Sequence, residues 1–149
     1  KGGLLYTDSY FSPELISGIV YYYYSTGELS SKKKYYKGLL QGFSTDYYKN
    51  GNDQTLTYYS NGKIEDVFTR YYKNGEIEEI FEYSNGYKHG AYIAQGEDGA
   101  LRIRGQYKQG QGVGKWDYYK KDGSFSYSID YWFIEHIIFE QRVMLWLPN

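Results

Sequence analysis

The residue types that most often perform chemistry are scarce in this sequence. Its only histidines, His89 and His136, lie far apart in the chain. A Ser-His-Asp site would need a strained nucleophile turn, and no Gly-x-Ser-x-Gly phrase occurs. The absence of cysteine excludes disulfides, thiolate metal sites and a cysteine nucleophile. We therefore predict no catalytic residue, no metal site and no cofactor.

Two short phrases still resemble chemical sites. The carboxylates of Glu76, Glu78 and Glu82 alternate along one predicted strand, with Glu79 on its other face, as an acid–base set or a metal site would require. A solvated acidic strand face explains the same pattern, and we prefer it. The phrase "GQGVG" at 110–114 suggests a phosphate loop, but no helix follows whose N-terminus would hold the anion. We interpret it as a turn.

Basic residues stand on both sides of this acidic stretch in the sequence. They are Lys32, Lys33 and Lys34 before it, and Arg102, Arg104 and Lys108 after it. Such a pattern would recognise a partner of complementary charge, because it steers encounter and fixes register, although solubility alone also explains it. The formal net charge is only −1, so we expect no nucleic-acid partner and no strong attraction to a membrane.

The elements that must position these residues follow a repeat of 24 residues. The phrase "YYKNG" occurs at 47–51 and again at 71–75. A glycine recurs in every register, and an aromatic residue follows eight positions after each one. Further glycine columns accompany these, one of them interrupted by Asp66. The two unbroken columns are Gly3, Gly27, Gly51, Gly75, Gly99, Gly123 and Phe11, Tyr35, Tyr59, Tyr83, Tyr107, Tyr131.

Each unit predicts a β-hairpin. Phrases such as "KNGN" and "EDGA" predict a tight turn, and phrases such as "SNGKIED" predict a looser turn before the next hairpin. These turns leave no room for an ordinary helix, and the 22 tyrosines favour strands. We predict an all-β fold, an elongated, twisted single sheet of about six hairpins over residues 1–131, with the aromatic column as its core.

Three phrases resemble the variant MORN repeat of bacteria: "GLLQGFSTDYYKNGN", "GYKHGAYI" and "GVGKWDYYKKDGSF". The family's units look like G-x-x-x-G-x-W-x-x-Y-Y-x-x-G-x-L, and residues 91–99 depart from it, with Gln95 and Gly96 where a tyrosine pair stands elsewhere. The resemblance implies a curved sheet of hairpins with a groove. It also implies a role as an antitoxin or immunity protein, or, as in eukaryotic members, as a lipid-associated or scaffolding module.

Candidate binding residues are those that the repeat does not require. Twelve of the 22 tyrosines occupy repeat columns, which leaves ten, and tyrosine is enriched in binding hot spots. The fourth hairpin departs from the repeat, and such departures are often functional. From these two groups we predict the partner-binding residues Tyr21, Tyr22, Tyr36, Tyr58, Tyr87, Tyr92, Arg102, Arg104 and Tyr118.

After Tyr131 the repeat ends in an apolar segment, residues 132–149. An end strand exposes unpaired backbone groups, so we predict that this segment caps the sheet, in preference to binding a partner. The patterns favour a non-enzymatic protein-binding module, an antitoxin or immunity protein that occludes a toxin or effector through a Tyr-rich sheet face. The alternatives are a structural scaffold or adhesive repeat protein and, less favoured, an enzyme or a lipid or glycan binder. Oligomeric state and compartment stay open, with the bacterial cytoplasm slightly favoured.

Overall fold

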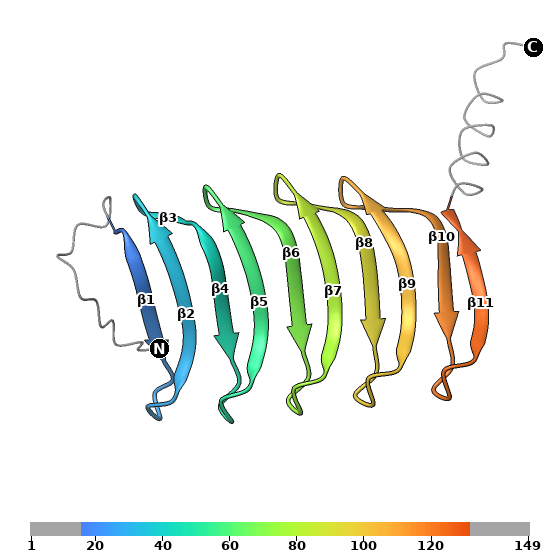
Figure 1. The fold of residues 1–149 in the computed structure, drawn as a ribbon, viewed down its shortest axis with the longest axis horizontal. Coiled ribbons are helices and arrows are strands. Elements are labelled where there is room, and N and C mark those ends of the chain that lie inside the picture. The colour runs from blue at the N-terminus through green and yellow to red at the C-terminus, as the bar shows by residue number, and fades with distance from the viewer. Residues whose placement is uncertain (1–15, 132–149) are drawn as a thin grey trace, which may run out of the picture.

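The computed structural model describes residues 16–131, which form one open antiparallel sheet of eleven strands. The strands follow one another across the sheet in sequence order, so each connection is a turn between neighbours (Figure 1). Only β3 leaves this order, since it pairs with β2 alone. The prediction of an all-β single sheet is confirmed. The segment 132–149 and its predicted capping role lie outside the described residues, as do Gly3, Phe11 and His136.

The strand bounds show the regular spacing that the repeat predicts. They are β1 Gly18–Tyr23, β2 Leu29–Tyr36, β3 Leu39–Leu40, β4 Gly42–Tyr47, β5 Asp53–Ser60, β6 Lys63–Tyr71, β7 Ile77–Ser84, β8 Tyr87–Gln95, β9 Leu101–Lys108, β10 Gln111–Tyr119 and β11 Phe125–Asp130.

Two kinds of turn alternate along the sheet. In the "YYKNG" turn the Tyr48 N–H donates to the Asn52 carbonyl at 2.8 Å and the Gly51 N–H to the Tyr48 carbonyl at 2.9 Å, which closes a three-residue loop with Gly51 at φ 88°. The "SNG" turn is shorter, because it holds only Asn61 at φ 50° and Gly62 at φ 78°. Positive φ at both residues matches the twist of a two-residue hairpin. The expectation that this turn is the looser one is therefore wrong.

A third glycine column shapes the strands themselves. Gly42, Gly90 and Gly114 follow the two-residue turns and adopt φ values of 86°, 104° and 64°. Asp66 interrupts this column in the sequence, yet it keeps the same conformation at φ 64°. The strand register shifts in this region in three of the pairings, from β5 with β6 onward. Such bulges bend a strand and increase its twist, so this column encodes the curvature of the hairpins.

The core lies on one face of the sheet, here called the aromatic face. Cross-strand pairing puts Phe81 between Phe68 and Tyr92, and the Phe81 and Tyr92 rings lie 4.7 Å apart. The buried cluster consists of Phe81, Tyr92, Ala94 and Trp116. The column tyrosines Tyr83, Tyr107 and Tyr131 pack against this cluster and are half-buried. The predicted ladder is thus part of the core, while the most buried rings stand in neighbouring columns.

Candidate partner-binding surface

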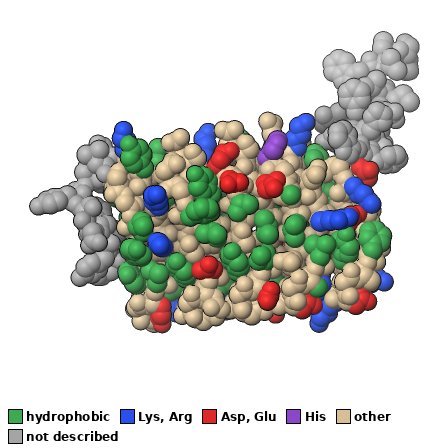
Figure 2. All heavy atoms as spheres, viewed as in Figure 1, with side chains coloured by type: hydrophobic (Ala, Val, Ile, Leu, Met, Phe, Trp, Pro, Cys, Tyr) green, Lys and Arg blue, Asp and Glu red, His purple; other side chains and the backbone are tan. Residues whose placement is uncertain are grey.

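The other side of the sheet, here called the opposite face, is defined by one row of cross-strand partners. Each residue of this row is the direct cross-strand partner of the next, from β1 to β11. Because directly paired residues point to the same side of a sheet, the whole row lies on one face. Its members are Tyr21, Lys32, Thr45, Leu56, Thr69, Ile80, Ile93, Arg104, Asp117 and Ser128. This face is turned to the viewer in Figure 2, where Lys and Arg stand toward both ends and Asp and Glu gather between them.

An exposed apolar patch lies on the opposite face over β1 to β5. We define it by Ile19, Tyr36, Leu39, Phe43 and Tyr58. The Phe43 side chain is 57% exposed and Tyr36 is 55% exposed, although Phe43 packs edge-on against the Tyr58 ring at 5.1 Å. Exposed apolar side chains gathered together and rimmed by charge are typical of an interaction surface.

The carboxylates of β7 divide between the two faces, as the alternation of residues predicts. Glu79 lies on the aromatic face, 3.5 Å from Arg70 and within 3.3 Å of the Tyr92 hydroxyl. Glu82 lies on the opposite face, where its carboxylate accepts the Ala91 N–H at 2.7 Å. No group of three His, Cys, Asp or Glu residues within the described range is arranged to hold a metal ion.

A hollow of about 440 Å³ lies on the opposite face over β8, β9 and β10. We call it the β8–β10 hollow. It is lined by Ala91, Tyr92, Ile93, Arg104, Gly105, Gln106 and Lys115. Its apolar lining residues offer van der Waals contact, and the exposed cationic side chains of Arg104 and Lys115 offer hydrogen-bond donors.

The buried carboxylate of Asp117 organises the cations beside this hollow. Asp117 is only 5% exposed, its Oδ2 accepts a hydrogen bond from Arg104 Nε at 2.8 Å, and Arg104 Nη2 lies 2.8 Å from the same oxygen as an ion pair. Its Oδ1 accepts from the Ser128 hydroxyl, and Lys115 Nζ lies 3.4 Å away. Hydrogen bonds from Ser128 and then Arg104 lower the pKa of Asp117 to about 2, because they stabilise the charged carboxylate. Arg104 is therefore oriented by a partner inside the fold.

The structure divides the nine predicted binding residues between different places. Five of them lie on the opposite face: Tyr21, Tyr36, Tyr58, Tyr87 and Arg104. Three lie on the aromatic face, namely Tyr22, Tyr92 and Tyr118. These three have internal partners, since Tyr22 shares a hydrogen bond with Tyr35, Tyr92 is 8% exposed in the core, and Tyr118 stacks on Tyr127 at 4.6 Å.

Arg102, the ninth predicted binding residue, packs against the turn before β9 and is not a member of the row of cross-strand partners on the opposite face. Its Nη2 donates to both Asp98 carboxylate oxygens at 2.7 Å, and Nη1 donates to the Ala100 carbonyl at 3.2 Å. A Cβ added to Gly96 would stand 2.6 Å from Nη2. Gly96 replaces the second tyrosine of the repeated pair, so the guanidinium occupies space that a side chain at 96 would need.

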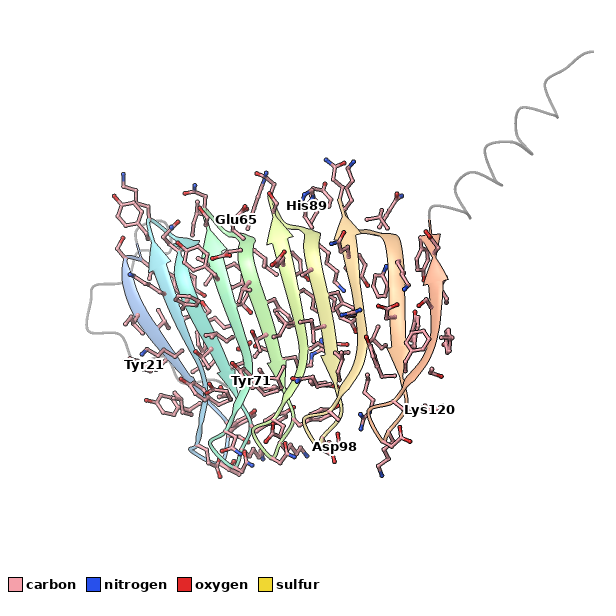
Figure 3. All side chains as sticks on the ribbon, turned by 45° about the vertical axis from the view of Figure 1, so that its right-hand side comes forward. Tyr21, Glu65, Tyr71, His89, Asp98 and Lys120 are labelled. Carbon is pink, nitrogen blue, oxygen red and sulfur yellow. The ribbon has the colours of Figure 1, made fainter. Side chains whose placement is uncertain are left out.

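Polar residues also stand at the two edges of the sheet where the turns lie. Figure 3 places Glu65 and His89 at the edge of the two-residue turns, and Asp98 and Lys120 at the opposite edge. At the first edge Glu65 accepts the Asn85 N–H at 2.6 Å. His89 is exposed, and it is the only histidine within residues 16–131.

Sequence reasoning missed several members of the surface, among them Ile19, Leu39, Phe43 and Lys115. The signal that would have found Phe43 is the period of two, because Phe43 and Thr45 alternate with the buried Ser44. Leu39 and Lys115 adjoin turns and bulges, where alternation alone does not assign a face.

Comparisons with known proteins add no assignment. The chain matches no protein-family model, and no curated protein is similar to it. In the part of the chain that the structure describes, no helix has the length and apolar character needed to cross a membrane.

Proposed function

We propose that this chain is a non-enzymatic protein-binding module and that its opposite face docks onto a protein partner. The observation that carries the proposal is the apolar patch, where Phe43 and Tyr36 are more than half exposed on a sheet whose other face already supplies the core. A binding surface with apolar side chains at its centre and charged ones around it is typical of specific protein interfaces.

The order of charges supports recognition of a specific partner. Lys32 and Lys34 stand on β2, Glu82 on β7, and Arg104 and Lys115 on β9 and β10. This order is positive, negative, positive along the face. A partner with the complementary order would be steered into one register, while a partner with another order would be repelled.

The finer proposal is that the partner is a toxin or effector, which the chain neutralises by covering it. The resemblance of the chain's repeated phrases to the variant MORN repeat is its support. The second candidate is a structural scaffold, which the open, elongated strand order also favours. A scaffold would hold partners without blocking their activity.

Co-purification with two matched variants tests the proposal. Phe43→Ser removes an exposed ring from the opposite face, and Tyr127→Ser removes a ring that is 52% exposed on the aromatic face. We expect the tagged wild-type chain and Tyr127→Ser to recover the same protein from the source organism, and Phe43→Ser to lose it. Recovery by Phe43→Ser at the wild-type level would contradict the proposed docking face.

A growth assay separates the antitoxin role from the scaffold role. The candidate partner is expressed alone, with the wild-type chain, and with Phe43→Ser. If the chain is an antitoxin, the wild-type chain restores growth and Phe43→Ser does not. If it is a scaffold, neither chain changes the partner's effect on growth. Circular dichroism and urea unfolding of each variant check that the substitution leaves the sheet folded.

A further inference from the structure

The three consecutive lysines at 32–34 have different surroundings, because neighbouring residues of a strand point to opposite faces. Lys33 lies on the aromatic face, and its Nζ is 3.5 Å from Asp46 Oδ1. Lys32 and Lys34 lie on the opposite face, in register with Tyr21 and Ile19. Within residues 16–131 neither of these two lysines makes an ion pair, and both are exposed. The run thus contains one internally paired cation and two that face outward.

The cations at the other end of the opposite face already have carboxylates of the chain beside them. Arg104 and Lys115 share Asp117 at 2.8 Å and 3.4 Å. Lys115 also has Asp130 as its cross-strand partner. An acidic group that entered the β8–β10 hollow would compete with these internal carboxylates. At β2 the same group would meet Lys32 and Lys34 without that competition.

Charge and apolar surface adjoin each other at β2. The Lys34 side chain lies over Gly42, since its Cδ is 3.3 Å from the place where a Cβ would stand. Gly42 immediately precedes Phe43 of the apolar patch, and Ile19 is the cross-strand partner of Lys34. The charged end of Lys34 therefore stands between two exposed apolar side chains of the patch.

We infer that this end of the opposite face binds an acidic and apolar segment of a protein partner. Carboxylates of the segment meet Lys32 and Lys34, and its apolar side chains cover the apolar patch. The inference rests on the proposed function and adds the chemistry of the partner to it. The chain's own carboxylates limit the contact, because Asp53 stands at the turn end of β5 and Glu82 on β7. These groups repel an acidic segment from the middle of the sheet and keep it at β1 to β4.

The same distribution favours a narrow protein segment over an anionic membrane. A membrane laid against this broad face would bring its negative surface toward Asp53 and Glu82 as well as toward the lysines. A segment only needs to follow β2 and β4, where the outward cations and the patch adjoin. The contact is therefore local, as the near-neutral net charge of −1 requires.

The single-charge variants Lys32→Gln, Lys33→Gln and Lys34→Gln of the full chain, together with the double variant Lys32→Gln with Lys34→Gln, test the inference. The probe is a synthetic peptide of alternating aspartate and phenylalanine, and its control contains lysine in place of aspartate. Binding is measured by fluorescence anisotropy at low and high salt. Vesicles of phosphatidylcholine with phosphatidylserine form a parallel arm.

We expect the wild-type chain to bind the aspartate peptide and not the lysine peptide, and binding to weaken as salt screens the charges. The double change Lys32→Gln with Lys34→Gln should weaken binding on the order of tenfold, which is the loss of two exposed ion pairs at an interface. Lys33→Gln removes one charge, as each of the other two single changes does, and should remain within about twofold of wild type, because the aromatic face on which Lys33 lies is not engaged.

Three results would overturn the inference. They are equal binding of the two peptides, a loss with Lys33→Gln as large as with Lys34→Gln, and binding of the anionic vesicles in preference to the aspartate peptide. Co-purification distinguishes a failure of the acidic-segment inference from a failure of the proposed docking function. A partner that is lost with Phe43→Ser but retained by the double lysine variant would refute the acidic segment alone. Recovery of the partner by all variants would refute the docking face.

Discussion

The Tyr48 hydroxyl donates a 2.7 Å hydrogen bond to the main-chain carbonyl of Tyr71, the first tyrosine of the corresponding pair one repeat later. Tyr24 makes the same bond to the Tyr47 carbonyl, and Tyr72 makes it to the Gln95 carbonyl at 2.9 Å. The turn asparagines add a parallel set, since Asn50 Nδ2 donates to the Lys73 carbonyl at 2.9 Å and Asn74 Nδ2 to the Glu97 carbonyl at 2.9 Å. Each of the two copies of "YYKNG" therefore joins its hairpin to the following one.

We expect Tyr48→Phe to lower the free energy of unfolding by about 1 kcal/mol, because the ring stays in place while the Tyr71 carbonyl loses its partner. Urea unfolding followed by circular dichroism measures the change. Tyr47→Phe is the matched control, since the Tyr47 hydroxyl has no hydrogen bond within residues 16–131 and only its carbonyl takes part in the series. Equal losses for Tyr47→Phe and Tyr48→Phe would show that the hydroxyl bond does not stabilise the junction.

Gly105→Ala should destabilise the sheet by about 1 to 3 kcal/mol through overpacking. The Trp116 ring lies flat over Gly105, and an added Cβ would stand 2.3 Å from its Cδ2 atom. Tryptophan fluorescence should shift as the ring is displaced toward solvent. A double-mutant cycle with Trp116→Leu supplies the control, because the cost of Gly105→Ala should fall once the ring is absent. An unchanged cost in that background would place the strain elsewhere.

Asp66→Gly should stabilise the chain by about 0.5 to 1 kcal/mol. Asp66 adopts φ 64° at a bulge where the corresponding residues of the neighbouring hairpins are Gly42 and Gly90. Glycine accepts that conformation without the steric cost that a Cβ brings, whereas Asp66→Ala should be less stable than the natural residue. Denaturation midpoints of the two variants test the order. A less stable Asp66→Gly would mean that the carboxylate contributes more than its backbone strain costs.

Alkaline pH should unfold the protein through the tyrosines of the aromatic face. Burial raises the pKa of Tyr92, Tyr83 and Tyr107, and burial together with the hydrogen bond that Tyr35 shares with Tyr22 raises the pKa of Tyr35. The folded chain therefore holds these protons more tightly than the unfolded chain does. The contribution of these tyrosines to stability should be constant below pH 10, the usual tyrosine pKa, and should be lost as pH rises above it.

Urea midpoints from pH 8 upward measure this fall, and tyrosinate absorbance follows the ionisation itself. Tyr92→Phe should flatten the pH dependence, since phenylalanine has no proton to lose. Tyr87→Phe is the control, because Tyr87 is 62% exposed at the start of β8. If both variants flattened the curve equally, burial on the aromatic face would not be its cause.

For some residues the sequence correctly predicts the face of the sheet on which the side chain lies, and for others it does not. The alternation along β7 correctly separates Glu79 from Glu82, because no turn or bulge interrupts the strand between them. The adjacent tyrosines Tyr21 and Tyr22 show the opposite case. Both exceed the repeat columns, but only the register with β2 shows that Tyr22 bonds to Tyr35 inside the aromatic face while Tyr21 faces the other way.

The sequence alone determines that this protein is an all-β sheet of successive hairpins, because glycine at fixed intervals marks each place where the backbone must adopt positive φ. Only the tertiary structure decides which side chains share a face and which are already paired. Each bulge inserts residues that break the count of two, and partners such as Arg104 and Asp117 meet only when separate strands are in register. That is why the repeat was readable from the chain, whereas the outward lysines and the apolar patch emerged only from the assembled sheet.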